Sequence, residues 1–183
     1  MRKISWKDTM QDCRRDLAAV GISANGSGST IFNALRIPGT RLLFMHRLQR
    51  FVGADSRFDA FVSSLIWNLG YLLSGCNVGR LASISGGVVF PHPVAIVIGN
   101  GVHIEPGCWI YQSVTLGATQ RDGILEYPRV AADCRFFPGA CVLGPVQVAA
   151  GTIVAANSVL LKSTEPGAMY AGNPAVKIRG GTP

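Results

Sequence analysis

The chain has 183 residues, of which 48% are hydrophobic and 15% are charged, a composition that excludes intrinsic disorder. This length is sufficient for a small domain followed by a repeat domain, and we expect part of the apolar surface to be buried between subunits. The formal net charge is +7, and the excess lies near the start, where residues 1–59 hold ten Lys or Arg against five Asp or Glu.

The chain has five cysteines, an odd number without any CxxC pair, so neither a disulfide framework nor a structural zinc site is predicted. No signal peptide is recognised at the start of the sequence. We therefore expect a cytoplasmic protein with reduced thiols and without a metal.

The first predicted helix begins at Ser5, which can cap it while Asp8 takes the Glu position of a capping box, and it ends at Gly21. Residues 24–30, with the sequence ANGSGST, are predicted to be a flexible break. Helical patterning then resumes at residues 31–35.

A further helix is predicted over residues 41–51, after an interruption at Pro38-Gly39. Its apolar face is expected to lie opposite Arg41, Arg47 and Arg50. We expect His46 to be an ordinary surface or packed histidine rather than a ligand.

The most hydrophobic run lies between Phe58 and Leu73, and Gly75 ends it. The run includes Asn68 and falls short of the roughly 20 residues needed to span a bilayer. We expect a helix buried against its neighbours or against another subunit. The alternative is a helix lying on a membrane surface, beside the basic N-terminal helices.

An aliphatic or aromatic residue recurs at every sixth position between Val78 and Leu160, with two interruptions. This period fits neither a helix nor a strand, but it is typical of parallel β-helices, in which each sixth residue points into a shared core. A β-sandwich is the alternative, although its turn signals would recur about every eight to twelve residues. The positions are Val78, Ile84, Phe90, Ile98, Ile104, Ile110, Leu116, Val130, Phe136, Val142, Val148, Val154 and Leu160.

Both interruptions of the repeat carry residues suited to chemistry. The first contains Pro91-His92-Pro93, and the second is the segment 118–128, which we predict to be a loop leaving one corner of the coil. The predicted division is a helical region at 1–75, a repeat domain at 76–165 and a C-terminal tail at 166–183.

Several stretches resemble the serine acetyltransferase-like branch of the hexapeptide-repeat acyltransferases. They are GGVVFPHPVAIVIGNGVHI, WIYQSVTLGAT, the loop end Tyr127-Pro128-Arg129-Val130 and the closing AGNPAVKI. The likeness runs from about Asn77 to Leu160 and extends back through IPGTRLLFMHRLQRF. It implies an α+β chain in which α-helices precede a left-handed parallel β-helix, assembled as a homotrimer with acetyl-CoA as co-substrate in the groove between neighbouring β-helices.

The resemblance assigns the catalytic base to His92, which would take the proton of an acceptor hydroxyl. The family orients this base with an Asp fifteen residues earlier, and that position is Asn77 here. An Asn carbonyl can accept a hydrogen bond from the imidazole but supplies no negative charge. A group on another subunit is the alternative orienter.

The resemblance also implies a path for acetyl-CoA. Small residues would let the pantetheine arm approach the backbone, and basic residues near the C-terminus are suited to the CoA phosphates. The residues are Gly117, Ala118, Gly139, Ala156, Lys177 and Arg179.

The predicted acceptor site departs from the serine-specific pattern. Family members place an Asp and an Arg-His pair where this chain has Pro91, Glu126 and Tyr127, so both ends of a zwitterion lose their recognition. We therefore predict a saccharide hydroxyl as the acceptor, as in acetylation of a surface polysaccharide or its precursor. The alternative is serine, with its carboxylate held by Arg121 or Arg129.

Two other functions are alternatives. A non-catalytic hexapeptide-repeat scaffold would have no need for His92 at the interruption. A carbonic-anhydrase-like protein needs three metal-binding histidines, and the chain has only His46, His92 and His103. No nucleic-acid partner is expected.

Overall fold

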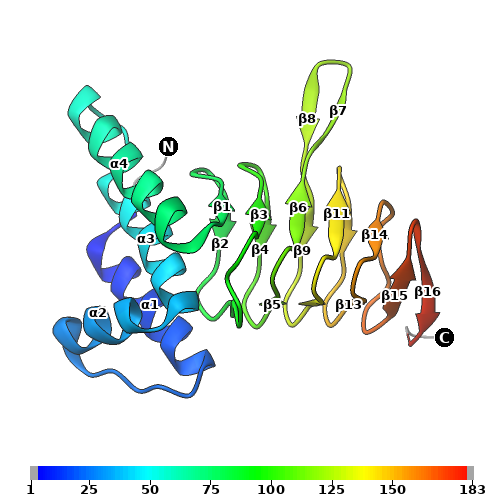
Figure 1. Cartoon of the computed structure of the whole chain (residues 1–183), viewed down its shortest axis with the longest axis horizontal. Coiled ribbons are helices and arrows are strands. Elements are labelled where there is room, and N and C mark those ends of the chain that lie inside the picture. Colours follow the sequence, from blue (N-terminus) through cyan, green and yellow to red (C-terminus); the bar gives the residue numbers. More distant parts are fainter. Residues whose placement is uncertain (1–3, 181–183) are drawn as a thin grey trace.

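The computed structural model describes residues 4–180 as four helices followed by a parallel β-helix (Figure 1). Ser5 caps the first helix as predicted, since the Asp8 N–H donates to Ser5 Oγ at 3.1 Å, but the capping box is incomplete because the Asp8 carboxylate accepts from the Ser5 hydroxyl, at 2.7 Å, and not from the Ser5 N–H. The helices are α1 (Trp6–Ala19), α2 (Gly26–Arg36), α3 (Pro38–Val52) and α4 (Arg57–Ser74).

The prediction of a flexible break at residues 24–30 is wrong, because α2 begins at Gly26. The Thr30 hydroxyl donates to the Gly26 carbonyl at 2.8 Å, and its side chain is fully buried. Tertiary packing of Thr30 and Ala34 therefore overrides the weak helix propensity of a Gly- and Ser-rich segment.

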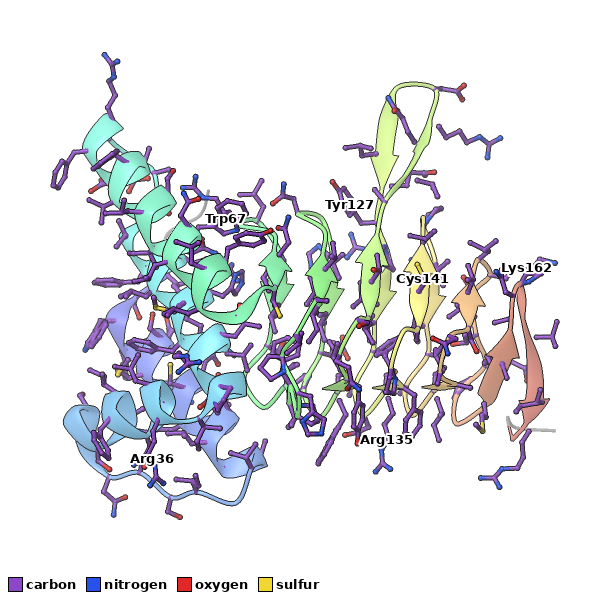
Figure 2. All side chains as sticks on the ribbon, viewed as in Figure 1. Arg36, Trp67, Tyr127, Arg135, Cys141 and Lys162 are labelled. Atoms are coloured by element: carbon purple, nitrogen blue, oxygen red, sulfur yellow. The ribbon has the colours of Figure 1, made fainter. Side chains whose placement is uncertain are left out.

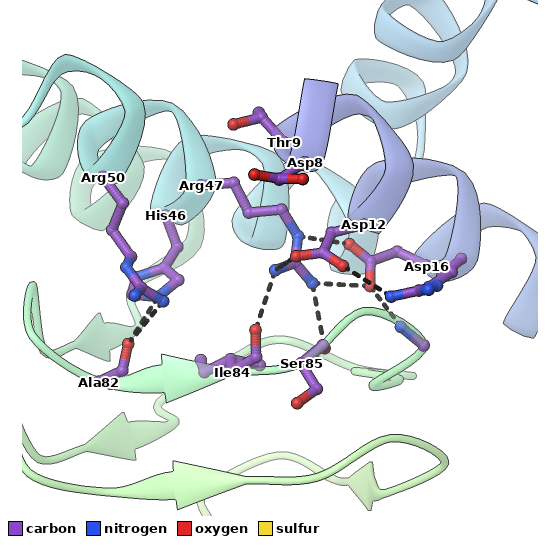
Figure 3. A network of polar contacts seen from close by, with 12 residues as sticks. Asp8, Thr9, Asp12, Asp16, His46, Arg47, Arg50, Ala82, Ile84 and Ser85 are labelled. Atoms are coloured by element: carbon purple, nitrogen blue, oxygen red, sulfur yellow. Dashed lines mark hydrogen bonds and ion pairs between the residues drawn. The ribbon is translucent and has the colours of Figure 1, made fainter. Parts of the chain in front are cut away.

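Helix α3 also differs from its predicted orientation. Arg47, expected on the face opposite the apolar residues, is 2% exposed and lies between α1 and the first coil (Figure 3). His46 is a packed histidine, with Nε2 at 3.2 Å from the Ala82 carbonyl. Leu42 and Leu43 join the solenoid core, so α3 covers the open end of the β-helix.

Helix α4 forms where the hydrophobic run predicted it, between the caps Ser56 and Gly75. Its apolar side chains are not all covered within one chain. Those on its outer side are exposed: Phe58, Phe61, Leu65, Leu69 and Leu72.

The β-helix consists of three sheets, here named A, B and C, whose solenoid strands are all parallel. The A sheet contains β1 (Asn77–Val78), β3 (Val97–Ile98), β6 (Thr115–Gly117), β11 (Cys141–Leu143) and β14 (Val159–Leu160). The B sheet contains β2 (Ser83–Ile84), β4 (His103–Ile104), β9 (Arg129–Val130) and β12 (Gln147–Val148). The C sheet contains β5 (Trp109–Ile110), β10 (Arg135–Phe136), β13 (Ile153–Val154), β15 (Met169–Gly172) and β16 (Ala175–Arg179).

The register of the sheets reproduces the six-residue period. In the A sheet, Val78 pairs with Ile98 and Ile98 with Leu116, while Val142 pairs with Leu160. All of these side chains lie inside the coil and are at most 4% exposed. The prediction that each sixth residue points into a shared core is confirmed.

The segment between β6 and β9 is a β-hairpin that projects from the solenoid (Figure 1). Its strands are β7 (Thr119–Arg121) and β8 (Ile124–Glu126), which pair antiparallel. Asp122 and Gly123 both have positive φ, as a two-residue hairpin turn requires. The predicted loop at 118–128 therefore has its own regular structure.

The C-terminal segment is more than a tail. Strand β15 pairs in parallel with β13, so the C sheet continues past the predicted boundary at residue 165. Strand β16 then folds back antiparallel on β15.

Candidate active site

His92 lies at the CA corner, defined here as the corner where each coil passes from the C sheet to the A sheet. A bridge between Val89 and Trp109 marks the C-sheet position of the first coil. The following turn is closed by a 2.8 Å hydrogen bond from the Val94 N–H to the His92 carbonyl. Pro93 is buried while His92 is exposed, so the two extra residues of the interrupted hexad present the imidazole outward.

Two aromatic residues continue from His92 down the CA corner. The His92 ring centroid lies 6.4 Å from that of Tyr111, and Tyr111 stacks on Phe137 at 5.4 Å. Such pairs contribute about 0.5–1.5 kcal/mol beyond burial. The sequence analysis missed both, although each directly follows a hexad residue and therefore occupies the same place in successive coils.

Asn77 begins β1 beside the segment that carries His92. Its N–H donates to the Ile96 carbonyl at 2.8 Å, and its side chain is exposed. Among residues 4–180 of one chain, the Asn77 amide makes no hydrogen bond to the imidazole. The role of Asn77 as orienter of His92 stays a prediction, as does an orienter from another subunit.

Gln112, in the QSVTLGAT motif, is a second residue that the sequence analysis missed. Its carbonyl accepts a hydrogen bond from the Gly139 N–H at 3.1 Å, which places it at the CA corner. Its side-chain Oε1 is buried without a hydrogen-bond partner in the described part of the chain. Since an unpaired buried acceptor costs about 1–3 kcal/mol, Gln112 is a candidate to accept a hydrogen bond from a ligand or a neighbouring subunit.

The predicted cofactor residues separate into two groups. Gly139 and Ala156 lie in successive coils at the CA corner, because the Asn157 N–H donates to the Pro138 carbonyl at 3.0 Å. The pair Gly117-Ala118 lies at the opposite edge of the A sheet, where the hairpin leaves the coil. Only the first group shares a corner with His92.

The predicted acceptor residues are also divided. Pro91 adjoins His92, but Arg121 and Glu126 lie on the hairpin at the other edge of the A sheet. A single chain therefore does not bring the hairpin residues together with the base.

Tyr127 packs within its own chain at the foot of the hairpin (Figure 2). Its ring lies against Gly99 and Gly101, where any side chain would overlap with it. The ring of Tyr127, at a predicted acceptor-binding position, therefore anchors the hairpin.

The two predicted phosphate-binding residues have different surroundings on β16. Lys177 Nζ lies 2.5 Å from Glu165 Oε2, so its charge is balanced within the chain. Arg179 is exposed and makes no ion pair with a described residue. Arg179 is therefore the better placed of the two for a phosphate.

The three histidines lie on three different elements: His46 on α3, His92 at the CA corner and His103 on the B sheet. Residues 4–180 contain no group of three or more His, Cys, Asp or Glu that could hold a metal ion. The arrangement gives no support to a carbonic-anhydrase-like site.

No protein-family model matches the chain. The serine acetyltransferase of Buchnera aphidicola subsp. Schizaphis graminum is 32% identical over 148 residues, which cover 79% of this chain and 55% of that protein. The serine acetyltransferase of Escherichia coli strain K12 is 36% identical over 99 residues, covering 54% of this chain and 36% of that protein. The chain spans about half the length, or less, of the curated relatives it matches.

The likeness in structure extends over almost the whole chain. A solved serine acetyltransferase in complex with CoA has a TM-score of 0.78 at 26% identity, covering 93% of this chain and 70% of that one. A complex with cysteine has a TM-score of 0.80 at 25% identity, with the same coverage. The predicted left-handed parallel β-helix is confirmed by these structures. Together with the six-residue register, they show that the chain belongs to the serine acetyltransferase-like branch of the hexapeptide-repeat acyltransferases.

Proposed function

We propose that this chain is an acetyl-CoA-dependent O-acetyltransferase with His92 as its general base. The observation that carries the proposal is the exposed imidazole at the CA corner, in a column with the small residues Gly139 and Ala156. The relative solved with CoA supports the co-substrate. Backbone beside such small residues is accessible to an extended ligand.

In the proposed reaction the imidazole accepts the proton of the acceptor hydroxyl while the hydroxyl oxygen bonds to the thioester carbon. Donors must then stabilise the oxyanion of the tetrahedral intermediate. Collapse of this intermediate breaks the carbon–sulfur bond, and the imidazolium returns its proton to the leaving thiolate of CoA.

For the acceptor, the comparisons favour serine or a serine-like amino acid over the saccharide predicted from the sequence. The relatives compared above are serine acetyltransferases. The argument for a saccharide counted Tyr127 among the acceptor-binding residues, whereas its ring packs on Gly99 and Gly101 of its own chain. Serine is therefore the acceptor that we propose.

A thiol-release assay with acetyl-CoA tests the reaction and the acceptor together. L-serine, L-homoserine and a panel of sugars are compared, with the His92→Ala variant as the blank. We expect release with L-serine at kcat/KM of about 10⁴ M⁻¹s⁻¹ or more. Thiol release with sugars alone would show that the acceptor is a saccharide. No release with any acceptor would contradict the enzyme and favour the non-catalytic scaffold.

We further propose a homotrimer that packs through the A sheet. The strands of this sheet carry no charged residue, and Val97 is 40% exposed in register with Thr115. The outer face of the B sheet carries polar residues, including His103 and Arg129. In such a trimer the hairpin of one subunit would reach the CA corner of the next, which would complete the site.

Multi-angle light scattering at micromolar concentration tests the assembly. The wild type should have the mass of a trimer, and Val97→Arg should have that of a monomer because it places a charge in the proposed contact. The same substitution at His103, on the polar B sheet, should leave the trimer intact. A wild-type monomer would contradict the proposal.

The proposed location is the cytoplasm, with peripheral membrane contact through α4. All five cysteines have free thiols, and the outer side of α4 exposes Phe61 and Leu65. No helix in the described part of the chain is long and apolar enough to cross a membrane.

Co-sedimentation with anionic phosphatidylglycerol vesicles tests the membrane contact. Wild-type protein should sediment with the vesicles, and the double variant Phe61→Ser/Leu65→Ser should not. Wild-type protein that stays in the supernatant would contradict the contact.

A further inference from the structure

A polar cavity lies between α4 and the first coils, apart from the aromatic column at the CA corner. Its volume is about 420 Å³. Trp67, one of its lining residues, lies on α4 beside the first coil (Figure 2). No lining residue is acidic. Those used below are Ser64, Trp67, Asn68, Asn77, Arg80 and Asn100.

The Arg80 guanidinium is held in one orientation by two hydroxyls. Its Nη1 donates to Ser64 Oγ at 2.9 Å and its Nη2 to Ser63 Oγ at 2.8 Å. The Ser63 hydroxyl donates to the Gln49 carbonyl, and the Ser64 hydroxyl to the Ala60 carbonyl. Because each hydroxyl donates its single proton to a carbonyl, both serine oxygens act only as acceptors towards Arg80.

The charge of Arg80 has no counterion in the described part of the chain. No carboxylate of residues 4–180 lies within ion-pair distance of it, whereas Arg47 pairs with Asp16, and Lys177 with Glu165. A guanidinium has five N–H donors, so three remain after the two serine bonds. An oriented, unpaired guanidinium at the wall of a cavity is suited to a carboxylate or a phosphate.

We propose that this cavity binds the carboxylate of the hydroxyl acceptor through Arg80. Arg80 follows β1 at the edge of the A sheet from which the hairpin also leaves, so in the proposed trimer the cavity of one subunit would face the CA corner, with His92, of the next. The amides of Asn68 and Asn100 supply neutral donors and acceptors for the rest of the ligand. The inference rests on the proposed function. Arg80 would supply the positive charge that serine-specific family members place at the position of Glu126.

Binding can be measured without catalysis, because the indole of Trp67 lines the cavity and its N–H donates to the Val78 carbonyl. Tryptophan fluorescence of the purified protein is titrated with L-serine and with L-serinamide, which lacks the carboxylate. We expect a saturable change with serine that serinamide does not produce and that Arg80→Gln abolishes. Arg36→Gln, on an exposed turn of α2, is the matched control and should behave as wild type.

CoA and dephospho-CoA are titrated in parallel, because a CoA phosphate is the other oxyanion that Arg80 could bind. A CoA response that needs Arg80, with no such dependence for serine, would overturn the acceptor assignment. Loss of the oligomer in Arg80→Gln, seen by light scattering, would show that Arg80 holds the subunits together instead of the ligand and would also overturn the assignment.

Steady-state kinetics then separate this inference from the proposed function. Arg80→Gln should raise KM for serine about 10- to 100-fold while kcat and KM for acetyl-CoA stay near wild type, and Arg80→Lys should recover part of the loss. If wild type acetylates serine but Arg80→Gln changes neither KM nor the titration, the carboxylate site is wrong and the proposed function stands. If wild type acetylates nothing, the proposed function fails, and the serine titration alone decides whether the site exists.

Discussion

Arg47 and Asp16 form a bidentate ion pair that fastens the helices to the first coil of the solenoid (Figure 3). Arg47 Nε and Nη2 each donate to an Asp16 carboxylate oxygen at 2.9 Å, and both side chains are 2% exposed. Arg47 also donates to the carbonyls of Ile84 and Ser85, while the Gly87 N–H donates to Asp16. The pair therefore joins α1, α3 and the first coil, three segments distant in the sequence.

Arg47→Met should lower the free energy of unfolding by about 3–5 kcal/mol, because it leaves the Asp16 carboxylate buried without its counterion. Urea denaturation at fixed subunit concentration measures this change. Arg14→Met, at an exposed position of α1, is the control and should change stability by less than about 0.5 kcal/mol. Equal effects of the two substitutions would show that the buried pair is dispensable.

His46 makes the stability depend on pH. Burial, together with the charges of Arg47 and Arg50, lowers the pKa of His46 to about 3. In the unfolded chain its pKa is about 6.5, so below that value the unfolded state binds the proton first. The contribution of the neutral His46 to the free energy of unfolding is therefore complete above about pH 6.5 and is lost as the pH falls towards 3. Between pH 7.5 and 5.0 the loss is about 2 kcal/mol.

The variant His46→Gln should lack this part of the pH dependence. The difference in unfolding free energy between pH 7.5 and 5.0, from urea denaturation, should be about 2 kcal/mol smaller than in wild type. His103→Gln, on the exposed face of the B sheet, is the control and should keep most of the wild-type dependence. An unchanged difference in His46→Gln would mean that another group controls the acid sensitivity.

His92→Ala should lower kcat by roughly 10²–10⁴, the usual contribution of a general base, while acetyl-CoA still binds. Thiol release measures turnover, and calorimetric titration with CoA measures binding. His103→Ala, remote from the CA corner, should retain wild-type turnover. Loss of CoA binding together with turnover in His92→Ala would assign His92 a structural role instead.

Asn77→Asp should preserve or raise kcat, because a carboxylate at this position can stabilise an imidazolium that an amide can only orient. Thiol release at saturating acetyl-CoA and L-serine measures kcat, with His92→Ala as the blank. A large fall in kcat would instead show that the Asn77 amide donates a hydrogen bond that a carboxylate cannot replace.

The sequence by itself determined the solenoid and its core. A side chain at every sixth position must point inward when three short strands close a coil, so Val78, Ile98 and Leu116 could be assigned to the core before any coordinates. The helix cap at Ser5 and the interruption at His92 could likewise be predicted, because both depend on residues close together in the chain.

Only the tertiary structure decided the roles of Arg47, Tyr127 and Arg80. From helical periodicity alone, Arg47 was predicted to face the solvent. Its burial depends on Asp16 and on carbonyls of the first coil, each more than thirty residues away in the sequence. Tyr127 packs on glycines of another coil, and Arg80 owes its orientation to serines on α4. Contacts between distant segments depend on how the whole chain closes, and a local pattern of residue types carries no information about them.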